Sequence, residues 1–130
     1  MTDSNLLENS GDRTHKYDLE ERSARFGERA IEYVRKINRD AVTSPLVTQL
    51  VRAATSVGAN YCEADEAGTK KEFRYLISVC KRESRECKYW LRMIAKAVPQ
   101  LREEARELWQ EANELTLIFA AIFRRSDTEN

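Results

Sequence analysis

Residues 69–99 read TKKEFRYLISVCKRESRECKYWLRMIAKAVP, and they carry the clearest helical pattern in the chain. Apolar and small side chains recur three and four positions apart, which places them on one face of an α-helix. These are Phe73, Leu76, Ile77, Cys80, Ser84, Cys87, Leu91 and Ile94. Thr69 and Glu72 form a capping box at the start, and Pro99 ends the helix. The pattern therefore predicts an amphipathic helix over about 70–97.

Three more amphipathic segments flank this helix. Asp18 and Glu21 form a capping box that predicts a helix over about 19–38. Ser44 and Pro45 predict the start of a helix over about 45–67, since proline is tolerated in the first turn. A fourth helix is expected over about 100–125. Because the links are short, the sequence predicts an all-α fold, an antiparallel up-down-up-down four-helix bundle over residues 18–125. Residues 1–17 are expected to form a flexible tail, and residues 126–130 a frayed end.

The composition agrees with a helical globular domain. The chain has 130 residues, 42% of them apolar, with only four glycines and two prolines. This apolar content argues against disorder, and the few turn residues argue against a β-sandwich or barrel. No apolar run is long enough for a membrane span, and the polar N-terminus does not resemble a signal peptide. We therefore expect a cytoplasmic protein with no membrane contact and with reduced cysteines.

The charges are balanced overall but not along the chain. Lys plus Arg and Asp plus Glu both number 22, yet residues 69–99 hold nine basic and three acidic residues. Seven basic residues fall on one stripe of the predicted helix, namely Lys70, Arg74, Lys81, Arg85, Lys88, Arg92 and Lys96. Such a stripe can follow a phosphate backbone, which indicates RNA or DNA as a partner. The alternatives are a solvated face paired with Glu103, Glu104, Glu107, Glu111 and Glu114, or the docking of an acidic protein.

A line of polar residues runs beside the predicted core. It comprises Arg52, Ser56, Asn60 and Glu63 on one helix and Glu83 and Glu86 on the next. Buried carboxylates need partners, so Arg52 and Asn60 are expected to pair with them across the contact between the two helices. We interpret this set as a structural network that fixes the helix register, rather than as an acid–base or metal site.

Some apolar faces are too wide for one bundle. Residues 115–123 read LTLIFAAIF, which is apolar around most of the helix. A helix of this kind is usually buried on all sides. We therefore predict a homo-oligomer, with an interface formed by Tyr75, Val79, Met93, Leu117, Ile118 and Ala121.

Catalytic patterns are missing from the sequence. The only histidine is His15, in the predicted tail, and the three cysteines include no C-x-x-C pair. No glycine-rich phosphate loop occurs. The sequence therefore predicts a protein that is not an enzyme and that uses no cofactor and no metal.

Two segments carry a family resemblance, RAATSVGANYCEADEA at 52–67 and EFRYLISVCKRESRECKYWLRM at 72–93. Together they resemble the bacterial family of proteins encoded by intervening sequences within 23S rRNA genes, over about residues 18–125. The markers are Arg52, Ser56, Asn60, Glu63, Phe73, Leu76, Glu86, Trp90 and Leu91.

The resemblance implies a four-helix bundle that assembles into a ring-like homopentamer. A related branch comprises the accessory proteins of diversity-generating retroelements, which are basic and bind nucleic acid and a reverse transcriptase. This chain differs from that branch by its zero net charge and by its acidic residues after position 100. The expected function is a scaffold that binds RNA or DNA, and the alternative is a protein-interaction adaptor such as a reverse-transcriptase accessory protein.

Overall fold

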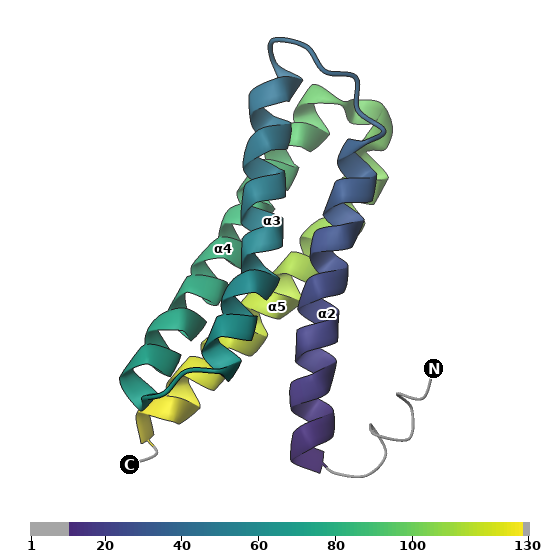
Figure 1. Ribbon diagram of the computed structural model, residues 1–130. Helices are drawn as coiled ribbons and strands as arrows, with labels where there is room; N and C mark the ends of the chain where they lie inside the picture. The colour runs from purple at the N-terminus through teal and green to yellow at the C-terminus, as the bar shows by residue number, and fades with distance from the viewer. Residues whose placement is uncertain (1–10, 129–130) are drawn as a thin grey trace.

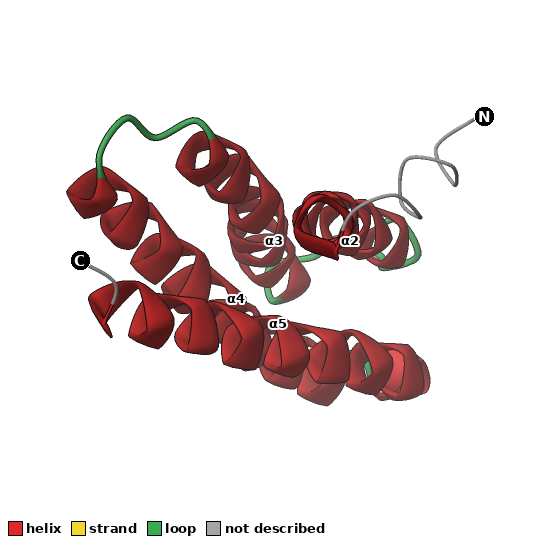
Figure 2. Ribbon diagram, turned by 90° about the horizontal axis from the view of Figure 1, so that it is seen from below, coloured by secondary structure: helices red, strands yellow, loops and turns green. Residues whose placement is uncertain are grey.

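The computed structural model describes the backbone of residues 11–128 and the side chains of residues 18–127. Four long helices follow one another, α2 (Gly11–Val34), α3 (Thr43–Asp65), α4 (Lys70–Ala97) and α5 (Arg102–Thr128), with a 3-10 turn, η1, at Pro99–Leu101. They run alternately up and down (Figure 1). Each helix packs against its neighbours in sequence, and α2 also contacts α5 (Figure 2). The predicted all-α four-helix architecture is confirmed.

Helix α4 has the bounds that the sequence predicts. The Thr69 side chain accepts a hydrogen bond from the Glu72 backbone N–H at 3.0 Å, and the Glu72 carboxylate accepts one from the Gly68 N–H at 3.3 Å. At the other end the Val98 N–H donates to the carbonyl of Ile94, and Pro99 opens the η1 turn. Local capping chemistry therefore sets both ends of this helix.

Helix α2 begins earlier than the sequence predicts. Residues 11–17, expected in the flexible tail, continue the helix, and Asp18 lies inside it rather than at its N-cap. A helix that is already nucleated gains a hydrogen bond for each added residue, so it can extend beyond the segment that the apolar pattern predicts. The expected tail at residues 1–10 lies outside the described residues. Helix α2 ends at Val34 rather than Asn38, because the N–H groups of Lys36 and Ile37 donate to carbonyls three residues back.

The start of α3 also differs from the prediction. The carboxylate of Asp40 accepts hydrogen bonds at 2.8 Å from the N–H groups of Val42 and Thr43, and these bonds hold the pKa of Asp40 below its usual value. The helix therefore begins at Thr43, and Pro45 sits in its first turn. The Ser44 hydroxyl, expected to cap the helix, instead accepts from Nε of Arg39 at 3.1 Å.

One contiguous core joins the four helices. Its largest fully buried side chains include Phe26, Tyr33, Leu50, Ile77 and Phe119. Where α2 packs on α3, a Cβ on Gly58 would lie 3.4 Å from the backbone of Ser23 and Ala24. Glycine at this position therefore lets the two helices pack closely.

The end of α5 is ordered where the sequence predicts fraying. Ser126 is buried, and its hydroxyl and the Phe123 carbonyl both accept from Nη1 of Arg74 at 2.8 Å. Asp127 lies 3.7 Å from the same guanidinium. These contacts hold the helix through Thr128, and residues 129–130 lie outside the described residues.

Candidate functional site

The basic stripe of α4 divides into an inner and an outer part. Arg74, Lys81 and Lys88 are half-buried against α5, and Lys70 is exposed at the first residue of α4. Arg85, Arg92 and Lys96 are exposed. These last three make no hydrogen bond or ion pair with any other residue in the described part of the chain. They form the outer part of the stripe and are available to a ligand.

The inner part is held by aromatic and polar groups of α5. The Arg74 guanidinium lies 4.0 Å from the centroid of the Phe123 ring, and the Lys81 ammonium lies 5.8 Å from it. Lys88 donates to the Asn113 side chain at 2.8 Å and lies 5.2 Å from the Trp109 ring centroid. Cation–π contacts of this kind stabilise packing without neutralising the charge. The side chains of the inner part therefore pack against α5 and keep their positive charge.

The acidic face of α5 is turned toward α2 rather than toward the basic stripe. Nε of Arg22 lies 2.7 Å from Glu111, and Nη2 of Arg22 lies 2.6 Å from Glu114. Lys36 pairs with Glu104 in the same way. The structure thus does not pair the stripe with these three glutamates, which was one of the alternatives from the sequence. These glutamates are instead paired with basic side chains on the α2 side of the bundle.

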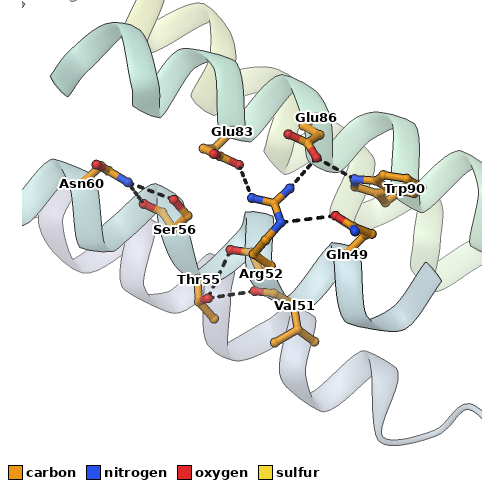
Figure 3. A network of polar contacts seen from close by, with 9 residues as sticks. All are labelled: Gln49, Val51, Arg52, Thr55, Ser56, Asn60, Glu83, Glu86 and Trp90. Carbon is orange, nitrogen blue, oxygen red and sulfur yellow. Dashed lines mark hydrogen bonds and ion pairs between the residues drawn. The ribbon is translucent and has the colours of Figure 1, made fainter. Parts of the chain in front are cut away.

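A polar network joins α3 to α4 (Figure 3). The guanidinium of Arg52 donates to Glu83 at 3.2 Å, to Gln49 at 3.2 Å and to Glu86. The Trp90 indole donates to the same Glu86 oxygen at 3.0 Å. The side chain of Glu83 is only 10% exposed, so its charge depends on Arg52 for compensation.

The remaining members of the predicted polar set lie outside this network. Asn60 donates to the carbonyl and hydroxyl oxygens of Ser56 at 2.9 Å, within α3 (Figure 3). Glu63 is exposed and makes none of these contacts. The structure therefore brings together Arg52, Glu83 and Glu86, and the predicted pairing of Asn60 across to α4 is wrong. An amide can satisfy itself on its own helix turn, whereas a buried carboxylate needs a cation.

The residues expected at an oligomer interface differ in accessibility. Tyr75 is 62% and Leu117 61% exposed, whereas Met93, Ile118 and Ala121 are partly buried. Val79 is buried within the subunit, so it has almost no surface to give to an interface. It lies on the side of α4 that also carries Glu83 and Trp90, the side that packs toward α3. The helical position was therefore misassigned to an outer strip.

The comparison with known families agrees with this architecture. The family model described as 23S rRNA-intervening sequence protein matches residues 15–121. The chain belongs to this family. No curated protein matches the chain. A solved structure, that of a protein of unknown function from the S23 ribosomal protein family of Bacteroides thetaiotaomicron, is similar with a TM-score of 0.71 and 22% identity, over 81% of this chain and 97% of that one.

The family assignment confirms the resemblance read from residues 52–67 and 72–93. At 22% identity, the solved neighbour supports the fold alone. Among the described residues, no group of three histidine, cysteine, aspartate or glutamate side chains is placed to hold a metal ion. No helix in this part of the chain has the length and apolar character of a membrane span.

The three cysteines of this family member have different environments. Cys62 is exposed on α3, with Sγ 3.9 Å from the Glu20 carboxylate, and Cys80 and Cys87 are buried in the core. Burial raises the pKa of Cys80 from 9.0 to about 12, and it raises that of Cys87 as well. Partial burial and Glu20 also raise the pKa of Cys62.

We expect one reactive thiol in the native protein and three after unfolding, because only an accessible thiolate attacks a thiol reagent.

Since the folded-state pKa of Cys80 lies above the unfolded value, the unfolded chain loses this proton first. The free energy of unfolding should therefore fall as the pH rises from about 9 toward 12. Thiol titration and urea unfolding at several pH values measure both effects. A Cys80→Ala control should show a weaker pH dependence, and rapid reaction of all three native thiols would contradict the buried positions.

Three residues of α5 were not singled out from the sequence as a group. Arg102, Arg106 and Trp109 follow one another on one side of α5, and they lie across from Arg92 on α4. Their i, i+4, i+7 spacing is visible in the sequence. The neighbouring glutamates make the segment acidic in sum, and this sum concealed the basic side of the helix.

Proposed function

We propose that this family member is a cytoplasmic, non-enzymatic homo-oligomer, with five copies favoured, that binds RNA through the outer part of the α4 stripe. One observation carries the proposal: Arg85, Arg92 and Lys96 remain exposed, while the acidic face of α5 is occupied by α2. The zero net charge therefore does not remove the positive potential of this face.

The geometry of the outer stripe suits a nucleic-acid strand. Arg85 and Arg92 are two helical turns apart, about 10 Å along the axis, and Lys96 follows one turn later. Tyr89 lies between them in sequence and is exposed, with its ring in a T-shaped contact with Trp90. Cations that alternate with aromatic rings are typical of surfaces that bind single strands.

Assembly would increase the number of phosphate contacts that the protein can offer to one RNA strand. A single stripe offers few phosphate contacts, but symmetry repeats it in every copy. The exposed Leu117, with the partly buried Ile118 and Ala121 beside it, supplies an apolar strip on α5 that a second copy can cover. Oligomerisation and binding are therefore linked in this proposal.

The test is a charge reversal with a matched control. The variant Arg85→Glu plus Arg92→Glu should weaken binding of a single-stranded RNA oligonucleotide by tenfold or more and reduce the salt dependence by about one unit of slope or more. The control, Arg25→Glu on α2 plus Arg35→Glu directly after its end, makes the same change in net charge on exposed side chains and should leave affinity nearly unchanged. Equal losses in both variants would overturn the role of the stripe.

Mass and co-purification test the rest of the proposal. Light scattering should give a species several times heavier than the 15.1 kDa chain. A species of the monomer's mass at micromolar concentration would overturn the assembly. Absence of RNA binding by the unaltered protein at low salt would overturn the RNA function. If an identified partner, such as a reverse transcriptase, bound through the stripe after nuclease treatment, the protein would instead be an interaction adaptor.

A further inference from the structure

A pocket of about 260 Å³ lies between the last turns of α4 and the first turns of α5. Its lining combines an apolar floor with basic and aromatic walls, formed by Leu91, Ala95 and Ala105 and by Arg92, Arg102, Arg106 and Trp109. Pockets that hold drug-sized ligands are usually about 300–1,000 Å³, so this one suits a smaller group. A single planar ring system with an attached anion is of this size.

The charge of the pocket is positive and largely uncompensated. Arg92 and Arg102 make no ion pair with any residue that the structure describes, and no carboxylate lines the pocket. Arg106 has one partner, Glu103, at 3.8 Å, and both side chains are well exposed, so this pair is weak. Three guanidinium groups around one opening favour a phosphate, which accepts bidentate hydrogen bonds.

The aromatic wall is held in position and remains accessible. Trp109 is 38% exposed, and the Lys88 ammonium lies 5.2 Å from its ring centroid. Lys88 is itself fixed by its hydrogen bond to Asn113. An indole fixed in this way can stack on a base without losing much side-chain freedom.

We propose that this pocket binds one unpaired nucleotide of an RNA strand, with its base on Trp109 and its phosphate between Arg92, Arg102 and Arg106. The inference deepens the proposed function and rests on it. Arg92 belongs both to the pocket and to the outer stripe, so a strand that follows Arg85 and Arg92 reaches the pocket directly. A base inside a duplex is already stacked and paired, so it cannot enter. The site therefore selects a single strand over a duplex.

Tryptophan fluorescence can follow the base directly, because the chain has only two tryptophans, Trp90 and Trp109. In a Trp90→Phe variant, single-stranded RNA should quench Trp109 emission, whereas a duplex of equal length should quench it much less. In the matched Trp109→Phe variant, the remaining Trp90 should respond weakly to either. Adenosine monophosphate serves as the free-nucleotide arm, and it should bind far more weakly than the strand.

Affinity measurements complete the test. Trp109→Leu should weaken single-stranded RNA binding by about 5- to 100-fold, as expected for the loss of one base–aromatic stack, and leave duplex binding unchanged. Arg102→Glu should also weaken single-strand binding, although Arg102 lies outside the α4 stripe. Circular dichroism verifies that both variants fold.

The outcomes separate this inference from the proposed function. If single strand and duplex bind equally and Trp109→Leu has no effect, while the Arg85→Glu plus Arg92→Glu variant loses binding, the pocket inference is wrong and the stripe remains. If adenosine monophosphate binds as tightly as the strand, the pocket belongs to free nucleotides and the strand assignment is overturned. If the unaltered protein binds no RNA, both proposals fail.

Discussion

Phe119→Ala is expected to lower the free energy of unfolding by about 3–5 kcal/mol. Phe119 is fully buried in α5, and its ring centroid lies 6.0 Å from that of Tyr61 on α3. Its removal would leave a cavity at a point where the two aromatic side chains fill the space between helices. Urea unfolding followed by circular dichroism measures the loss.

Leu117 provides the control for this substitution. It lies two residues away on the same helix but is 61% exposed. Under conditions where the protein is monomeric, Leu117→Ala should change the free energy of unfolding by about 0.5 kcal/mol or less. A loss below about 1 kcal/mol for Phe119→Ala would contradict the packing described for this part of the core. A loss for Leu117→Ala that grows with protein concentration would support assembly through α5.

The sequence predicted the bundle because its main signals are local. Apolar spacing identified all four helices. The Thr69–Glu72 cap and Pro99 set the bounds of α4 through contacts between residues that are close in sequence. The errors have two causes. The start of α3 is fixed by a competing local cap, Asp40, five residues before Pro45, and the end of α5 by a distant contact, Arg74 on another helix.

The candidate site was predictable in residue type but not in pairing. Helical spacing grouped the basic stripe on one side of α4 and the polar line beside the core, yet it could not determine which neighbouring helix each face meets. The acidic residues of α5 lie on the side of α2, where Arg22 binds Glu111. The aromatic rings of Phe123 and Trp109 meet the stripe instead. This choice depends on the rotation of α5 about its axis, which is a tertiary property.

The pocket beside Trp109 shows why the net charge of a sequence segment can mislead. Residues after position 100 are acidic in total, with seven acidic and four basic residues. The acids and the arginines occupy different sides of α5, so the helix presents opposite charges to α2 and to solvent near α4. A net charge describes solubility and long-range attraction, whereas recognition depends on the side that is exposed.

Arg52→Ala is expected to lower the free energy of unfolding by about 2 kcal/mol, because it leaves the carboxylate of Glu83 almost buried and without its cation. The effect is smaller than for a fully buried pair, since the Arg52 side chain is itself 46% exposed and water can partly replace it. Glu86 keeps the hydrogen bond from Trp90 in the variant, so Glu83 accounts for most of the loss.

A second substitution in the same background tests this explanation. If the cost arises from an uncompensated carboxylate, Arg52→Ala plus Glu83→Leu should be more stable than Arg52→Ala alone, because an apolar side chain needs no partner at this position. Glu63→Gln, an exposed carboxylate on the same helix as Arg52, is the control and should change stability by about 0.5 kcal/mol or less. A double-mutant cycle for Arg52 and Glu83 with no coupling would contradict the pair as a register-fixing contact, whatever the size of the single effects. A coupling of about 1 kcal/mol or more would support the Arg52–Glu83 pair as a contact that holds α3 and α4 in register.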